Sequence, residues 1–327
     1  MIQVQHLKAI IQQIMLAMLT FLLVASCGTN SIQPNQISAI YSSSPASECR
    51  LIQHAMGETC VPLNPQRVIT IDPFSLENVF ALGIQPVGVA VSSAWLEERT
   101  FLRDRLSGVE IVGNLNQPNL EKVLSLKPDL ILGLVEDETI YSQLTRIAPT
   151  VSFDFQSSEQ WKEILMHNAM SLGKTEVANQ LIEAYGDRLK NFKAQISLRE
   201  NFRLMTVSVL RVTNAGVSPY LSDTFCSNIL QDAGLNLISE PEDWLVSLER
   251  ISDLDADVIF VWSYGYQAAI AQTAQPILQL IRTNPLWQQL KAVQKEQIYV
   301  VPSYWIGSGI LSANAVIDDL FEHLVKG

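Results

Sequence analysis

Two kinds of hydrophobic pattern alternate along most of the chain. Short apolar runs, within residues 67–72, 119–132 and 247–260, predict buried strands. Between such runs, apolar residues recur every three or four positions, which predicts helices with one buried face. Strands that alternate with helices form mainly parallel sheets through right-handed crossovers. We therefore expect an α/β fold.

An internal repeat predicts two related lobes. Residues 119–132 align without gaps on residues 247–260: each copy has an N-cap residue, a short helix, an Asp and an apolar strand. Two further units recur in the same order, since residues 67–72 match 203–208 and residues 78–83 resemble 228–234. We expect a first lobe at residues 49–158 and a second lobe at residues 199–327.

The region between the lobes, residues 159–198, has helical periodicity. Its apolar positions Val177, Leu181, Tyr185, Leu189 and Phe192 fit about six helical turns. One long helix is therefore expected to join the lobes, and a single stiff connection favours tilting over wide hinge closure. Because open α/β sheets bind ligands beyond the carboxyl ends of their strands, we expect a ligand cleft between the lobes.

The N-terminus has the pattern of an export signal. Residues 1–26 combine a weakly cationic start with a short apolar stretch and end in small residues before Cys27. The ending Val24-Ala25-Ser26-Cys27 resembles a bacterial lipobox, in which the cysteine is lipidated and becomes the first mature residue. An ordinary signal peptide or a membrane anchor is the alternative. Residues 27–48, rich in Ser, Asn, Gln and Pro, are expected to form a flexible tether.

Cysteines provide a second indication of the compartment. Cys49 and Cys60 flank an alternating segment around a Met-Gly turn, which predicts an N-terminal β-hairpin. An oxidising compartment would permit a disulfide between them. Two unpaired, half-buried cysteines are the alternative, because the strand register is not fixed by the sequence. Cys226 is expected to be a buried core thiol.

Composition and motifs exclude several classes of function. The chain of 327 residues is 48% hydrophobic and 17% charged, which is typical of a globular protein. Its 22 basic and 33 acidic residues give a net charge of −11, so nucleic acid is not an expected partner. Neither a Gly-x-Ser-x-Gly elbow nor a phosphate-binding loop is present, so a hydrolase is disfavoured and no enzymatic activity is expected.

Several ordered motifs carry a family resemblance. They are residues 50–62 (RLIQHAMGETCVP), 65–69 (PQRVI), Leu120-Glu121, 127–132 (KPDLIL) and 300–305 (VVPSYW). In this order and spacing the chain resembles the iron(III)-siderophore-binding lipoproteins of ABC importers. These belong to the helix-linked class of periplasmic binding proteins, and the vitamin B12-binding protein is a relative. The resemblance covers residues 49–325, and it implies two α/β lobes, a ferric siderophore as ligand and a location outside the cytoplasmic membrane.

The resemblance also implies partners. Glu121 and Glu249, one in each lobe, match the glutamates that meet arginines of the membrane permease, which works with its own ATPase. The alternative role is local, because a carboxylate in the first turn of a helix stabilises the helix dipole by about 0.3–1 kcal/mol. We expect a monomer that is attached to the membrane by its lipid anchor, in the periplasm or on the outer face of the cytoplasmic membrane.

The cleft is expected to contain residues that follow the strands. A ferric siderophore brings its own oxygen ligands to iron, so aromatic contacts and charged hydrogen bonds should hold it, with no metal ligand or cofactor from the protein. For Arg211 the alternative is an internal ion pair with Asp223, and for the tryptophans it is core packing. The candidates are Phe74, Trp95, Asn114, Arg211, Tyr220, Trp262, Tyr264 and Trp305.

Other aromatic and charged residues have less specific assignments. Trp161, Trp244 and Trp287 are expected to pack in the fold. The run of Arg99, Arg103 and Arg105 could add positive potential, although a solvated charged helix is expected for most of it.

Two alternative ligands remain within the same fold. A zinc or manganese site would need converging histidines, but those outside the signal, His54, His167 and His323, lie in three different contexts. Haem or cobalamin is the stronger alternative, because aromatic side chains would cradle either macrocycle.

Overall fold

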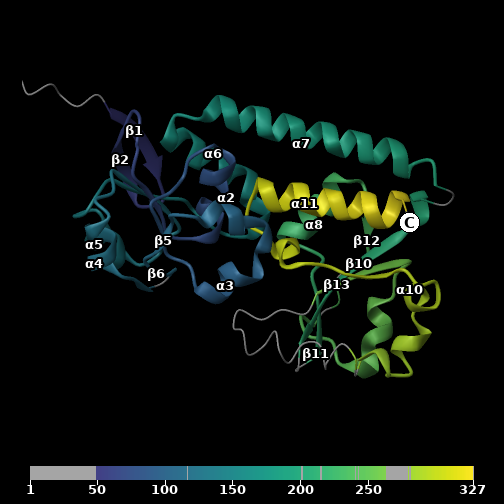
Figure 1. Ribbon diagram of the computed structural model, residues 1–327. Helices are drawn as coiled ribbons and strands as arrows, with labels where there is room; N and C mark the ends of the chain where they lie inside the picture. The colour runs from purple at the N-terminus through teal and green to yellow at the C-terminus, as the bar shows by residue number, and fades with distance from the viewer. Residues whose placement is uncertain are drawn as a thin grey trace, which may run out of the picture. The chain divides into compact units, whose positions relative to one another are not determined.

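Two five-stranded sheets form the framework of the structure, a computed structural model (Figure 1). It describes residues 49–115, 117–199, 202–213, 216–239, 241, 243–262, 279 and 281–326. The signal, Cys27 and the tether expected at residues 27–48 lie outside the described residues. No helix among the described residues combines the length and apolar character that a membrane crossing requires.

The first sheet is entirely parallel, with strand order β5-β4-β3-β8-β9. Its central strands are buried on both faces, which explains their continuous apolar sequence. The strands are β3 (Val68–Thr70), β4 (Gly88–Val89), β5 (Glu110–Ile111), β8 (Leu130–Gly133) and β9 (Thr150–Ser152). The connecting elements are α2 (Pro73–Ala81), α3 (Ser93–Glu98), η1 (Thr100–Leu106), the small hairpin of β6 (Gly113–Asn114) and β7 (Gln117–Pro118), α4 (Leu120–Ser125) and α5 (Glu138–Leu144).

The second sheet repeats the order of the four strands β4-β3-β8-β9, and its fifth strand is antiparallel. Strand β10 (Thr206–Thr213) pairs in parallel with β13 (Val258–Trp262) and with β12 (Asn236–Leu237), and β14 (Ile298–Val300) follows β13. The extra strand β11 (Gly216–Pro219) folds back on β10. The other elements are η3 (Phe202–Leu204), α8 (Phe225–Asp232), η4 (Leu248–Leu254), η5 (Trp287–Gln289), α10 (Lys291–Gln294), η6 (Ser303–Ile306), α11 (Ile310–Leu320) and η7 (Phe321–Lys326).

The repeated Asp has the same structural role in both sheets. Asp129, just before β8, accepts hydrogen bonds from the backbone N–H groups of Gln66 and Arg67 at 2.7 and 2.8 Å. Asp257, just before β13, accepts one from the N–H of Thr206 at 3.0 Å. Each Asp therefore ties the start of one central strand to the start of its neighbour, which explains why the sequence repeat includes this residue.

The region between the sheets contains two helices after a short turn. Turn η2 (Ser158–Gln160) leads into α6 (Trp161–Leu172), and α7 (Thr175–Ile196) is a separate helix of 22 residues. The long helix is thus confirmed for the later apolar positions only. Gly173 ends α6 in the left-handed conformation, with φ of 66°, and the N–H of Lys174 bonds back to the carbonyl of Ala169.

Helix α11 links the C-terminal part of the chain to the first lobe. It packs against α2 and α6 as well as α7 and α8, and it lies beneath α7 in Figure 1. One buried apolar cluster accordingly includes Val79 and Leu132 of the first lobe together with Val209 and Phe260 of the second. The two sheets therefore share a continuous core.

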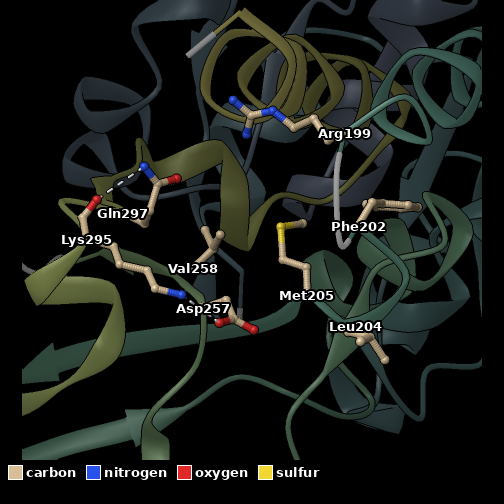
Figure 2. Close-up of a pocket in the computed structure, with 8 residues that line it drawn as sticks. All are labelled: Arg199, Phe202, Leu204, Met205, Asp257, Val258, Lys295 and Gln297. Atoms are coloured by element: carbon tan, nitrogen blue, oxygen red, sulfur yellow. Dashed lines mark hydrogen bonds and ion pairs between the residues drawn. The ribbon is translucent and has the colours of Figure 1, made fainter.

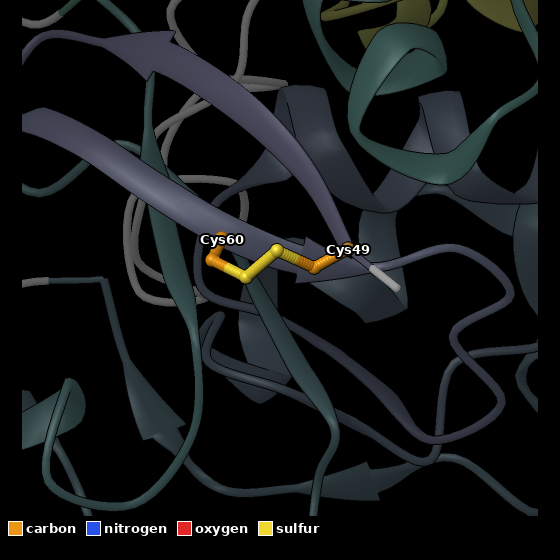
Figure 3. The surroundings of a disulfide bond; sticks show 2 residues. All are labelled: Cys49 and Cys60. Atoms are coloured by element: carbon orange, nitrogen blue, oxygen red, sulfur yellow. A yellow bond between two sulfur atoms is a disulfide. The ribbon is translucent and has the colours of Figure 1, made fainter. Parts of the chain in front are cut away.

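The N-terminal hairpin is closed by a disulfide. Strands β1 (Cys49–His54) and β2 (Gly57–Pro62) are antiparallel, and Cys49 and Cys60 are bridged across them (Figure 3). Cys49 pairs with Pro62 and Cys60 pairs with Leu51, so the cysteines are diagonal neighbours with Cα atoms 5.5 Å apart. The N–H of Ala55 bonds to the carbonyl of Ser152, which attaches the hairpin to β9.

The expected packing residues are buried with one exception. Trp161 and Trp287 are 0% and 3% exposed, and the Cys226 thiol is fully buried, which raises its pKa to about 11. The prediction is wrong for Trp244, which is 79% exposed. The buried position of this loop is taken by Val246, which is 1% exposed and pairs with Val217, and Trp244 is left in solvent.

Candidate ligand-binding site

A pocket of about 240 Å³ lies at the carboxyl ends of the strands and is lined by both lobes. This is where ligands bind in open α/β sheets. The first lobe contributes the start of α2, helix α3 and the segment after β9, and the second contributes the end of β11, the start of α8 and the segment after β14. The lining residues are Pro73, Phe74, Trp95, Arg99, Phe155, Ser158, Tyr220, Phe225, Trp305, Ile306, Gly307 and Ser308.

Four predicted aromatic residues come together in this pocket: Phe74, Trp95, Tyr220 and Trp305. Phe74 and Phe155 are neighbours on the wall of the first lobe, with ring centroids 5.2 Å apart. Phe155 was not among the predicted residues, because the short strand before it, β9, was not identified from the sequence. That the four aromatics contact a ligand stays a prediction.

Arg99 is the buried cation of the pocket. Its side chain is 2% exposed, its guanidinium carbon lies 3.9 Å from the centroid of the Trp95 ring, and Nη2 donates to the carbonyl of Ile306 at 3.4 Å. Arg103 and Arg105 are exposed, as expected for most of that run, so Arg99 is the exception. Its distance from Trp95 of four positions along the chain is the sequence signal that could have identified it.

Glu77 binds the second lobe and interacts electrostatically with Arg99. Its carboxylate accepts hydrogen bonds from the Ser308 and Ser312 hydroxyls at 2.9 and 2.7 Å and from the Ser312 N–H at 3.1 Å. Burial raises the pKa of Glu77, and the Ser312 hydroxyl and the positive charge of Arg99 oppose that rise. A residue of α2 thus binds the first turn of α11 from the other lobe and faces the cation of the pocket.

Asp72 fixes the start of α2, and hence Pro73 and Phe74. Its carboxylate accepts the N–H of Ser75 at 2.9 Å, as an N-cap, and the N–H of Leu134 at 3.1 Å. Complete burial raises its pKa to about 6, although these hydrogen bonds act in the opposite direction. Gly133 lies against this carboxylate with φ of 151°, where a Cβ would overlap it.

Arg211 and Trp262 form a layer behind Tyr220. They are paired in register on β10 and β13, and the Arg211 guanidinium carbon lies 5.1 Å from the centroid of the Trp262 ring. Tyr220 packs edge-on against Trp262 with centroids 5.0 Å apart. Trp262 is 1% exposed, so the structure places it in the core under Tyr220, and neither it nor Arg211 is part of the pocket lining.

Trp305 combines packing with its place in the pocket lining. Its ring is fully buried, with the Phe260 centroid 4.4 Å away, and its Nε1 donates to Asp319 at 2.7 Å. The Tyr304 hydroxyl donates to the other oxygen of Asp319 at 3.0 Å. Asp319, which was not predicted, therefore holds the segment that carries Trp305.

The remaining predicted site residues lie elsewhere. Asn114 is exposed on the β6–β7 hairpin and does not line the pocket, because the chain turns away from the sheet after β5. Tyr264 and Cys27 lie outside the described residues. Glu121 and Glu249 are both exposed in the first turns of α4 and η4. Backbone N–H and Ser247 hydroxyl hydrogen bonds lower the pKa of Glu249.

A larger pocket, of about 420 Å³, lies at the opposite ends of the strands (Figure 2). Met205 precedes β10, Val258 begins β13 and Gln297 precedes β14, so the pocket is at the amino ends. Figure 2 shows Lys295 directed at Asp257, and their Nζ and Oδ1 atoms are 3.4 Å apart. The lining residues all belong to the second lobe, and this is not the edge of an α/β sheet that binds ligands.

No metal site is found among the described residues. They include no group of three His, Cys, Asp or Glu side chains placed to hold a metal ion. Burial lowers the pKa of His54, and the nearby His167 lowers it further. His323 lies elsewhere and stacks on Tyr299, with ring centroids 4.3 Å apart.

Comparison with known proteins identifies the family. A family model described as periplasmic binding protein matches residues 68–305. The chain belongs to the periplasmic binding protein family. This is a class of substrate-binding proteins, and its two-lobed architecture agrees with the expected fold class, which is confirmed.

Several similar proteins have names or titles that state what they bind. The probable siderophore-binding lipoprotein YfiY of Bacillus subtilis is 30% identical, over 98% of this chain and 99% of that protein. The achromobactin-binding periplasmic protein of Dickeya dadantii is 29% identical, over 78% and 85% of the two chains. The crystal structure of Staphylococcus aureus SirA with staphyloferrin B is 29% identical, with a TM-score of 0.72 over 84% of this chain and 98% of that chain.

Proposed function

We propose that this protein is the substrate-binding component of an ABC importer, and that it captures an iron(III)-siderophore between its lobes and delivers it to the permease. The observation that carries the proposal is the pocket at the carboxyl ends of the strands, where both lobes supply aromatic side chains and the first supplies the buried cation Arg99. The similarity to siderophore-binding relatives over almost the whole chain supports the same ligand class.

The chemistry of the pocket fits a chelate that has already satisfied its iron. Oxygen atoms of the siderophore fill the coordination positions of the iron, so the protein needs to recognise the outer surface of the complex. Phe74, Trp95 and Tyr220 provide apolar faces, and Arg99 provides donors for carboxylate or hydroxamate oxygens. Iron in this proposal is part of the ligand, and the protein holds no cofactor of its own.

The volume of the pocket limits how a chelate can sit in it. About 240 Å³ lies below the roughly 300–1,000 Å³ typical of small-molecule sites. We therefore expect part of the chelate to project from the pocket, with the end that carries negative oxygens directed at Arg99.

Titration of tryptophan fluorescence tests the proposed ligand, because Trp95 and Trp305 line the pocket. Full-length protein in mild detergent is titrated with ferric citrate, a ferric hydroxamate, a ferric catecholate, haem and cobalamin. We expect saturable quenching by one ferric chelate, weakened about tenfold or more in Arg99→Gln because a charged hydrogen bond is lost. The exposed Arg103→Gln is the control. Saturation by haem or cobalamin alone would mean that the pocket binds that ligand and not a ferric siderophore. No response to any of the five compounds would contradict the proposed function.

The partners and the location are part of the proposal. Glu121 and Glu249 place one exposed carboxylate on each lobe, which suits a permease that spans both lobes and presents cationic side chains. Attachment through Cys27 would keep the monomer in the periplasm or at the outer face of the cytoplasmic membrane. Labelling with radioactive palmitate that persists in Cys27→Ala would contradict this attachment.

A further inference from the structure

Exposed apolar side chains accompany both glutamates. Trp244, in the loop before η4, is 79% exposed, and Leu124, three residues after Glu121 in α4, is 59% exposed. Ile111, at the end of β5, is 38% exposed. A tryptophan that leaves most of its surface in water is uncommon, and tryptophans are enriched among residues that dominate protein interfaces.

In the second lobe, the loop that carries Trp244 is attached to the helix that carries Glu249. Arg250 reaches Asp243 at 2.6 Å with one nitrogen and Asp253 at 2.9 Å with the others. Beyond Trp244, an antiparallel bridge joins Val246 to Val217 through two backbone hydrogen bonds of 2.8 and 3.2 Å. The backbone bridge holds the loop, and the exposed ion pairs orient it, so Trp244 and Glu249 belong to one surface.

In the first lobe, a cation makes the corresponding attachment. Lys122 follows Glu121, and its Nζ donates to the carbonyl of Ile111 at 3.1 Å. Residues three apart on a helix are neighbours, so Leu124 lies beside Glu121. Glu121, Leu124 and Ile111 are thus brought to one surface.

The two surfaces have the same construction. Lys122 and Arg250 occupy equivalent positions in the sequence repeat, directly after Glu121 and Glu249. Each lobe therefore has a glutamate, a following cation that binds an earlier segment, and an exposed apolar side chain on that segment. Ile111 and Trp244 are these side chains, and a feature that occurs once in each lobe suits a partner with two equivalent surfaces.

We propose that Trp244 in the second lobe, and Leu124 with Ile111 in the first, are the apolar anchors of two docking surfaces for the membrane permease, an inference that rests on the proposed function. The matching surfaces of the permease carry cationic side chains beside apolar ones. The net charge of −11 favours approach to such a cationic surface, and the glutamates orient it. The apolar side chains then set the lifetime of the complex, because interface truncations act mainly on dissociation.

Iron uptake by cells tests this inference. In cells that make the protein, its gene is replaced by Trp244→Ser or Leu124→Ser, and uptake of radioactive iron is measured from ferric citrate, a ferric hydroxamate and a ferric catecholate. The controls are Leu204→Ser and Leu51→Ser, which truncate side chains of matching exposure, 77% and 62%. We expect uptake to fall about tenfold or more in Trp244→Ser and several-fold in Leu124→Ser, with unchanged chelate affinity and unchanged controls.

Charge reversal at Glu121 and Glu249 separates this inference from the proposed function. Loss of uptake in the Glu121→Lys, Glu249→Lys double variant, but full uptake in Trp244→Ser and Leu124→Ser, would overturn the apolar anchors and leave the docking glutamates intact. If uptake in Trp244→Ser and Leu124→Ser falls only as much as their affinity for the chelate, the apolar anchors are likewise overturned. Uptake that does not depend on this gene for any of the three chelates would overturn the proposed function and this inference together.

Discussion

At the scale of single residues, two buried carboxylates of α2 organise the pocket. Asp72 holds the start of the helix against Leu134, and Glu77, further along, holds the first turn of α11 and faces Arg99. Both are completely buried, and burial raises the pKa of both. An isolated buried carboxylate is unfavourable, so the N–H and hydroxyl donors around each are required by the fold.

Asp72 is expected to couple folding to proton uptake. The pKa of Asp72 is about 6 in the folded protein and 3.8 ordinarily. The contribution of Asp72 to stability is therefore fully present below pH 3.8, and it is lost as the pH rises through about 6. The free energy of unfolding of the wild type, relative to Asp72→Asn, should therefore rise as the pH falls from about 7 to 4, by up to about 3 kcal/mol. Urea unfolding at several pH values measures it.

Asp137 provides a control, because its contribution to stability should change with pH in the opposite direction. It caps α5, but it is fully exposed, and N–H bonds from Ile140 and Thr139 lower its pKa. The contribution of Asp137 to stability is present at pH values above its ordinary pKa, and it is lost as the pH falls through the lowered pKa of the folded state. The stability of the wild type relative to Asp137→Asn should thus fall on acidification, and equal slopes for the two caps would contradict both assignments.

Glu77 is expected to balance the charge of Arg99. In Glu77→Gln, Oε1 can accept the Ser312 N–H while Nε2 donates to the Ser308 and Ser312 hydroxyls, so the charge is removed and each partner keeps a hydrogen bond. Arg99 would then be buried without that opposite charge, and we expect a loss of about 1–3 kcal/mol in the free energy of unfolding. Ser308→Ala, which removes one hydrogen bond, should cost about 1 kcal/mol in the same urea titration. Wild-type stability in Glu77→Gln would show that another group balances Arg99.

At the scale of elements, Gly173 separates the two linking helices. Its left-handed conformation, with φ of 66°, disfavours a side chain, and a Cβ there would come within 2.6 Å of the Arg50 guanidinium. Gly186 lies inside α7, and a Cβ there would meet no atom within 4 Å.

Replacing these two glycines by alanine should change the free energy of unfolding in opposite directions. Gly173→Ala should lower the free energy of unfolding by about 1 kcal/mol, because alanine is strained in the left-handed region. Gly186→Ala should raise it by about 0.5–1 kcal/mol, because alanine favours the helix. Thermal unfolding of the two variants checks the signs, and stabilisation by Gly173→Ala would mean that α6 and α7 can merge into one helix.

Local patterns in the sequence predicted the elements better than the contacts between them. The repeat identified the paired strands, and it included Asp129 and Asp257 because each acts within its own lobe. Gly173 was not recognised as a helix end, since a lone glycine inside a helical pattern is often tolerated. The hydrogen-bond partners of Arg99 and Glu77 named above come from far along the chain, in the second lobe, and one sequence does not reveal such contacts.

The same distinction applies to the candidate site. Phe74, Trp95, Tyr220 and Trp305 were found because they follow predicted strands or turns. Trp262 has the same position relative to its strand, but the pleat directs its ring under Tyr220. Side chains that alternate across a sheet cannot be assigned to a face without the neighbouring layers.

At the scale of the whole described chain, the shared core limits movement between the lobes. Helix α11 packs on α2 and α6, and Glu77 binds its first turn. Wide opening would expose apolar residues of both lobes and separate a buried carboxylate from its donors, and both changes are unfavourable.

Ligand binding should therefore move the lobes only slightly. Spin labels on exposed sites of α5 and α10 report the distance between the lobes, and we expect a change of about 1 Å or less when the ferric chelate binds. Labels on α4 and α5, both in the first lobe, give the reference for local change. A shift several times larger would mean that the contacts of α11 break during binding.

The position of α11 in the chain also has a consequence for biosynthesis. The helix that covers α2 begins at Ile310, so the first lobe lacks part of its packing surface until α11 has been made. A chain that crosses a membrane unfolded benefits from this order, because stable folding of the first lobe waits for α11. The packing surface of α2 is therefore completed only after α11 has been synthesised.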